Sequence, residues 1–145
     1  MKALIQRVTS ASVSVAGEIV GQIDSGLVAL IGVTHDDDLA RAVKLASKIV
    51  NLRVMDDSDG VMNLSVADTC GSVLAISQFT LYGDTAKGRR PSWTAAANPE
   101  VAEPLVQAVI DELRVQNVTV ETGIFRAEMV VQITNDGPVT VMIEL

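Results

Sequence analysis

The chain has 145 residues, a length that fits one domain spanning residues 1–145. It carries 11 Lys and Arg residues against 18 Asp and Glu residues, a formal net charge of −7, so its overall field repels phosphate backbones. No window approaches the ~18 uninterrupted apolar residues of a membrane-spanning helix. The single cysteine, Cys70, excludes an intrachain disulfide and argues against a zinc module. We therefore expect a cytoplasmic protein that needs no metal, no cofactor and no membrane.

The first third of the chain is typical of strands. Residues 1–8 become polar too early for an export signal and predict a first strand. Residues 13–15 and 19–23 predict two short strands around a Gly-containing turn, which is a hairpin pattern. The nearly continuous apolar run from Leu27 to Val33 predicts a strand that is buried on both faces.

An amphipathic helix is predicted after the acidic triplet Asp36–Asp38. These carboxylates favour a helix start through capping and charge, and we prefer this interpretation to a metal site. The polar loop 56–60 lacks the closing Glu of a calcium loop, so turn chemistry explains it better. The apolar stripe of the helix consists of Leu39, Ala42, Val43, Ala46, Ile49 and Val50.

A second helix is predicted to start at Asn98 and Pro99, a capping residue followed by a proline at the first helical position. Pro104 removes one backbone donor, so the regular helix begins near Glu103 or its first turns are kinked. The predicted buried stripe consists of Val101, Leu105, Val109 and Leu113.

Further strands predict an α+β domain with mostly antiparallel pairing. Residues 72–81 form a strand that runs into a polar and aromatic segment. The last strands are predicted at 118–120, 129–134 and 139–145, with 135–138 as the turn between the final two.

Common catalytic residues are scarce in this sequence. His35 is the only histidine, and no Ser or Cys nucleophile motif surrounds it, which favours a solvated loop histidine over a Ser-His-Asp triad. Cys70 has no basic sequence neighbours that would activate its thiol, which favours a structural role. The chain also lacks the Gly-rich phosphate-binding loops of kinases, GTPases and dinucleotide enzymes.

Two segments combine polar residues with strand or turn signals. Ser77–Leu81 (SQFTL) places hydrogen-bonding side chains at the end of an apolar strand, although alone this pattern fits an ordinary strand. Asn135–Thr140 (NDGPVT) fits a turn. Its Gly-Pro bond can adopt the cis form at a cost of only about 0.5–1 kcal/mol.

Taken together, the two segments resemble signatures of the D-aminoacyl-tRNA deacylases. The similarity extends over the whole chain from residues 3–8 and includes residues 87–92 and 122–125. Two positions depart from the family pattern. Arg126 stands where a small residue is expected, and Trp93 stands where a Phe is usual, so both are expected to affect how the tRNA end is seated.

The resemblance implies a homodimer with a barrel-like core and two main helices. It implies hydrolysis of the ester between a D-amino acid and the 3′-terminal adenosine of tRNA, action on glycyl-tRNA mischarged on tRNA-Ala, and rejection of L-aminoacyl-tRNA. It implies that Ser77, Gln78, Phe79 and Thr80 are catalytic. The substrate-binding residues that it implies are Arg7, Phe125, Met129, Gly137 and Pro138.

In the implied mechanism, the Gly137–Pro138 corner of one subunit enters the pocket of its partner. Rigid carbonyl oxygens then leave room for hydrogen but not for an L side chain, so glycine must also pass. Arg7 is expected to hold the corner across the dimer by donating to those carbonyls; the alternative is an ordinary surface arginine at the end of a strand.

The ester is activated, so amide N–H groups and hydroxyls near Ser77, Gln78 and Thr80 suffice to hold the developing oxyanion. Thr80 is a possible nucleophile, but no activating His, Lys or Asp adjoins it in sequence. We prefer attack by water, assisted by the ribose 2′-hydroxyl.

Local basic residues offset the acidic balance of the chain. Lys87, Arg89 and Arg90 predict a tRNA-binding loop, to which Arg126 adds, although a solvated loop also fits. Two other functions stay open: a hydrolase of small amino-acid esters without RNA, and a noncatalytic dimeric interaction domain.

Overall fold

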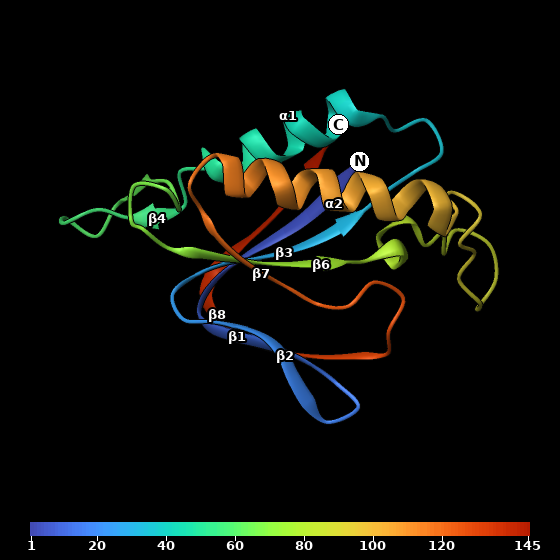
Figure 1. Ribbon diagram of the computed structural model, residues 1–145, viewed down its shortest axis with the longest axis horizontal. Coiled ribbons are helices and arrows are strands. Elements are labelled where there is room, and N and C mark those ends of the chain that lie inside the picture. Colours follow the sequence, from blue (N-terminus) through green and yellow to red (C-terminus); the bar gives the residue numbers. More distant parts are fainter.

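A computed structural model describes all residues from 1 to 145. Strands dominate, and two long helices cover one side of the main sheet (Figure 1). The elements are β1 (Lys2–Val15), β2 (Glu18–Ile23), β3 (Gly26–Gly32), α1 (Leu39–Val50), β4 (Met55–Asp56), β5 (Met62–Leu64), β6 (Ser72–Ser77), the 3₁₀ helix η1 (Phe79–Tyr82), α2 (Pro99–Val115), β7 (Thr119–Thr122) and β8 (Met129–Glu144).

The main sheet is mixed. Its order is β2-β1-β3-β6-β7, and β8 pairs with the other edge of β1. β1 is antiparallel to β2, β3 and β8, as predicted, but β6 is parallel to both β3 and β7. The prediction of mostly antiparallel pairing is confirmed, and the parallel pairs β3–β6 and β6–β7 are additional features that it did not include. These two pairs are parallel because α1 and α2 lie in crossover connections, which return the chain to the same end of the sheet.

The sheet curves into a nearly closed, barrel-like shape around a small second core. β1 pairs with β3 along its first half and with β2 along its second half. β2 approaches β7 so closely that a Cβ at Gly21 would lie 2.7 Å from the Thr122 carbonyl oxygen. The larger core lies between the sheet and the helices, and the smaller one is enclosed by β1, β2, β3, β6 and β8.

The first helix confirms its predicted start. Asp38 caps α1 by accepting from the Arg41 N–H at 2.8 Å. Asp37, however, turns inward and binds the N-terminal ammonium at 2.5 Å. Leu39 and Val43 of the predicted stripe are exposed instead of buried, whereas Ala42, Leu45, Ala46, Ile49 and Val50 are buried.

The second helix begins at Pro99 and continues through Pro104, so the regular part does not wait for Glu103. Asn98 occupies the N-cap position without a side-chain capping bond. The buried stripe differs from the prediction, because Val101 is exposed and Leu105 only partly buried. The buried residues are Val106, Val109, Ile110 and Leu113.

The predicted hairpin is confirmed, but the predicted C-terminal turn is wrong. β1 and β2 are joined through Ala16 and Gly17, both with positive φ. Residues 135–138 do not reverse the chain between two strands, because the residues on both sides of them belong to one strand, β8, which pairs with β1 along its whole length. Val8 pairs with Asn135 and Gln6 with Thr140, so five steps of β8 span two steps of β1. Residues 136–139 are therefore a bulge that leaves the ladder and returns to it.

Candidate active site

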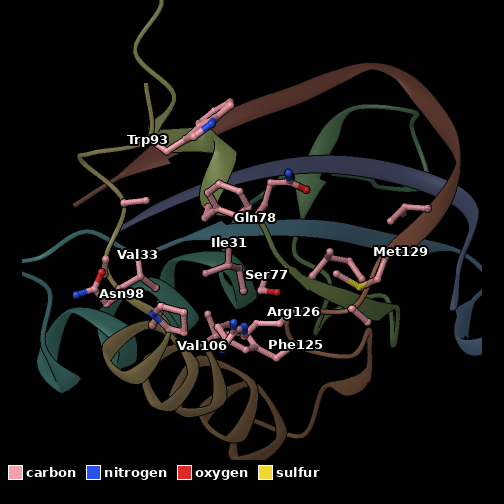
Figure 2. A pocket seen from close by; sticks show the side chains of 18 residues that line it. Ile31, Val33, Ser77, Gln78, Trp93, Asn98, Val106, Phe125, Arg126 and Met129 are labelled. Atoms are coloured by element: carbon pink, nitrogen blue, oxygen red, sulfur yellow. The ribbon is translucent and has the colours of Figure 1, made fainter. Parts of the chain in front are cut away.

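A pocket of about 600 Å³ opens where β3 and β6 end, bordered by η1 and the start of α2 (Figure 2). Ser77, Gln78, Phe79, Phe125 and Met129 all line this pocket. The structure thus brings together five of the nine catalytic and substrate-binding residues expected from the sequence. Most other lining residues are apolar, so the few polar groups lie among hydrocarbon side chains.

The polar corner of the pocket forms because β6 ends there. The Gln78 N–H donates to the Ile31 carbonyl at 2.7 Å, which completes the sheet and removes this amide as an oxyanion donor. The chain then turns into η1. The N–H groups of Phe79 and Thr80 open this 3₁₀ helix and have no acceptor within it. Of these two residues, only Phe79 lines the pocket.

Thr80 is placed differently from its neighbours. Its residue is exposed and lies outside the pocket lining, and its hydroxyl accepts a hydrogen bond from the Gln78 side-chain amide. The only histidine, His35, donates from Nε2 to the Thr94 carbonyl at 2.8 Å. Neither contact supplies a base for the Thr80 hydroxyl.

An aromatic pair forms one wall of the pocket. The rings of Phe79 and Trp93 meet edge to face, with centroids 5.6 Å apart and an interplanar angle of 76°. Both residues remain exposed, by 55% and 41%, so their faces are accessible. Gly83 makes this arrangement possible, because a Cβ there would overlap Cζ3 of Trp93. The bare backbone of Gly83 therefore leaves the space that the indole of Trp93 occupies.

The wall that carries Trp93 is tied to the loop after β3. Thr34 Oγ1 donates to the Ala95 carbonyl at 2.6 Å, and the Ala97 N–H donates to the Val33 carbonyl at 2.9 Å. The sequence did not indicate this tie or the contribution of Ala96–Pro99 to the lining. A small-residue run before a helix gives no chemical signal by itself.

The opposite wall contains Phe125, Arg126 and Met129. Met129 lies against Gly123, where a Cβ would overlap its sulfur. Arg126 has a φ of 63°, the left-handed region that favours glycine. This conformation gives a physical reason for the small residue expected there.

Arg7 is buried, with only 7% of its surface exposed, so the surface-arginine alternative is wrong. Its Nη1 donates to the Val54 carbonyl and to Asp56, each at 2.8 Å. Its Nε lies 2.9 Å from Oδ2 of Asp136, although its N–H does not point at that oxygen. Within the chain, Arg7 therefore ties the β4–β5 region to the bulge of β8.

The Gly137–Pro138 corner is exposed, and its peptide bond is cis. Asn135 fastens the base of the bulge, because its side-chain amide donates to the carbonyls of Arg7 (2.8 Å) and Val139 (3.2 Å). Asn135 pairs with Val8, which is opposite Gly26 at the start of β3.

Ser77, in contrast, pairs with Ile31 near the end of β3. Ile31 lies five residues, roughly 16 Å, along β3 from Gly26, and Gly26 is opposite Val8, the residue that pairs with Asn135 at the base of the bulge. Gly137 and Pro138 therefore do not join Ser77 and Gln78 within one chain.

Lys87, Arg89 and Arg90 lie on an exposed loop beside the aromatic wall. The loop is closed at its base by paired backbone hydrogen bonds between Asp84 and Ser92, at 2.8 and 2.9 Å. The three cations have no ion pair within the chain.

No helix is long and apolar enough to cross a membrane.

Known proteins resemble this chain over almost its whole length. The family model for D-Tyr-tRNA(Tyr) deacylase matches residues 4–144. A D-aminoacyl-tRNA deacylase of Fervidobacterium nodosum is 58% identical over 144 residues, which cover 99% of this chain and 97% of that protein. A solved "c-Myc DNA Unwinding Element Binding Protein" has a TM-score of 0.93 and 38% identity, with 100% of this chain and 99% of the other covered. A structure of a probable eukaryotic D-amino acid tRNA deacylase has a TM-score of 0.87 at 14% identity, covers 99% and 98% of the two chains, and shows likeness of fold.

Proposed function

The chain belongs to the family of D-aminoacyl-tRNA deacylases and is a hydrolase of this kind, and we propose that its reaction takes place in the pocket at the end of β6. The observation that carries this proposal is the convergence of Ser77, Gln78, Phe79, Phe125 and Met129 on one mostly apolar cavity. The reaction is hydrolysis of the ester that joins a D-amino acid to the 3′-terminal ribose of tRNA. A cytoplasmic location follows from this substrate.

Water attacks the ester carbonyl in this proposal. The N–H groups of Phe79 and Thr80 are the backbone donors available to the developing oxyanion, and each such donor contributes about 10²–10³ in rate. Ser77 and Gln78 position the substrate around that point. Thr80 acts as a positioning residue, because its hydroxyl contacts the Gln78 amide and has no base beside it. The ribose 2′-hydroxyl of the substrate assists the water.

Discrimination between D and L substrates requires a second copy of the chain. Gly137 and Pro138 are exposed and lie far along the sheet from Ser77, so a corner that gates this pocket comes from a partner in a homodimer. Main-chain carbonyl oxygens at the α-carbon exclude an L side chain by collision and admit glycine. The same enzyme therefore also hydrolyses glycyl-tRNA mischarged on tRNA-Ala.

Arg7 is positioned to stabilise that corner. Its guanidinium is held by Val54, Asp56 and Asp136 next to the bulge, so the side chain has one fixed direction. In the dimer, it donates to the carbonyls of the corner across the interface.

The acceptor end of tRNA approaches along the loop that carries Lys87, Arg89 and Arg90. This loop adjoins the aromatic wall and offers three unpaired cations to phosphates on a chain that is acidic as a whole. The local charge directs the tRNA to this side of the molecule.

The proposal is tested by deacylation of D-tyrosyl-tRNA and L-tyrosyl-tRNA by the purified protein. We expect hydrolysis of the D substrate and of glycyl-tRNA, and survival of the L substrate. Equal hydrolysis of D-tyrosyl-tRNA and D-tyrosine methyl ester would indicate a small-ester hydrolase without an RNA partner. Sedimentation in the same buffer tests the dimer, and a monomer that still rejects L-tyrosyl-tRNA excludes the cross-subunit gate.

A further inference from the structure

Arg126 occupies a position that is unfavourable for its own backbone. The Ala127 N–H donates to the Ile124 carbonyl at 3.2 Å, which closes a turn with Phe125 and Arg126 in its centre. Arg126 is the second central residue, and its φ of 63° is that of a type II turn, where glycine or asparagine is favoured. A long cationic side chain in such a position is a reason to look for a function.

The turn places this arginine at the pocket. Arg126 is the only charged residue among the 18 that line it, and it lies beside Phe125, on the side that faces Val106 of α2 (Figure 2). Most of the other lining residues are hydrophobic. The guanidinium makes neither an ion pair nor a side-chain hydrogen bond within the chain. The pocket therefore holds one cation whose donors are not used.

The chemistry of guanidinium limits what it can recognise. Its planar donors match carboxylate and phosphate oxygens in pairs, and they repel the α-ammonium of an aminoacyl ester. Arg126 is exposed to solvent although it lines the pocket, so paired hydrogen bonds to an oxyanion, and not a low dielectric, give such a contact its strength. We propose that Arg126 recognises an oxyanion of the bound substrate, an inference that rests on the function proposed above.

Two oxyanions of an aminoacyl-tRNA have this chemistry. One is the side-chain carboxylate of a D-aspartyl or D-glutamyl ester, and the other is a phosphate next to the terminal adenosine. The first produces selectivity among amino acids. The second raises the binding affinity of every aminoacyl-tRNA by the same factor and makes binding more dependent on salt concentration.

The experiment compares the wild-type protein with Arg126→Gly, which removes the charge and relieves the turn, and with Arg126→Lys, which keeps the charge without the fork. Asn117→Gly is the matched control, because Asn117 is an exposed residue with a φ of 62° beyond the C-terminal end of α2. Single-turnover rates are measured for D-aspartyl-, D-asparaginyl- and D-tyrosyl-tRNA at several salt concentrations. Quenching of the single tryptophan, Trp93, measures binding of AMP and adenosine without catalysis.

If the carboxylate is recognised, Arg126→Gly lowers the D-aspartyl to D-asparaginyl rate ratio by about 10-fold or more, whereas the control Asn117→Gly leaves this ratio unchanged. If a phosphate is recognised, Arg126→Gly weakens the binding of all three tRNA substrates by the same factor. The slope of log affinity against log salt concentration then falls by about one, and AMP no longer binds more tightly than adenosine. Unchanged ratios, salt slope and AMP binding overturn the inference while the deacylase survives. A wild-type protein that leaves D-tyrosyl-tRNA intact overturns the proposed function itself.

Discussion

The substitution Asp37→Asn tests whether the inward-facing carboxylate anchors the fold. The Asp37 side chain is fully buried and accepts from the N-terminal ammonium at 2.5 Å, from the Thr34 N–H at 2.7 Å and from Arg41 at 3.1 Å. An asparagine amide places a donor against these donors and leaves the ammonium buried without a countercharge. Breaking a buried pair in this way costs about 3–5 kcal/mol. At about 2–4 °C per kcal/mol for a chain of this size, the melting temperature falls by roughly 6–20 °C.

The pH dependence of stability gives the same test a second readout. Burial raises the pKa of the Asp37 carboxyl, but the hydrogen bonds from the ammonium, Thr34 and Arg41 outweigh it, so the pKa lies below the usual 3.8. Because the folded pKa is below the unfolded one, the contribution is complete well above pH 3.8 and is lost as pH falls through the folded value. The stability difference between wild type and Asp37→Asn therefore narrows in acid.

The assay is urea unfolding of tag-free protein between pH 7 and pH 3, with Asp36→Asn as the control. Asp36 is an exposed neighbour, and its side chain makes no hydrogen bond or ion pair within the chain, so its loss changes the free energy of unfolding by less than about 0.5 kcal/mol. Equal stability of the two variants at pH 7 would refute the anchoring role.

Three further outcomes are expected. Thr80→Ala lowers the single-turnover rate by less than about 10²-fold, because one positioning contact is removed, whereas a loss near 10⁵-fold would indicate a covalent role. Reversing Arg89 and Arg90 to Glu weakens tRNA binding and flattens its salt dependence, measured by filter binding; unchanged affinity would place the tRNA elsewhere. Gly83→Ala displaces the indole of Trp93, which we expect to see as a shifted fluorescence maximum and a raised KM, and an unaltered emission spectrum would contradict the close packing.

Local patterns in the sequence predicted much of the fold. The hairpin between β1 and β2 follows from a Gly-containing turn between short apolar runs, and α1 follows from its spacing and the Asp38 cap. The buried arc of α2 could not be read in this way. It packs against α1 as well as the sheet, which moves burial toward Val106 and Ile110 and away from Val101.

The last strand shows a second limit. Asn135–Pro138 has the composition of a turn, yet both flanking segments pair with β1, and this partner determines that the segment bulges without reversing. Composition reports the local backbone preference, whereas the direction of the chain beyond it depends on tertiary pairing.

The candidate site also has one part that could be predicted from local sequence and one part that depends on tertiary pairing. The segment Ser77–Leu81 lies at the pocket because its polar residues directly follow a buried strand, a relation visible in sequence. The partners of Arg7 were not visible. Asp56 and Asp136 are 49 and 129 residues away along the chain, so only the folded sheet brings them together.

The bulge of β8 also limits edge-to-edge aggregation of the protein. β8 is 16 residues long and pairs only with β1, so its outer side presents main-chain donors and acceptors to the surroundings. A straight edge of this length is a template on which another polypeptide can extend the sheet. Residues 136–139 leave the regular ladder near the middle of β8, so a strand from another chain cannot form continuous hydrogen bonds along the whole edge.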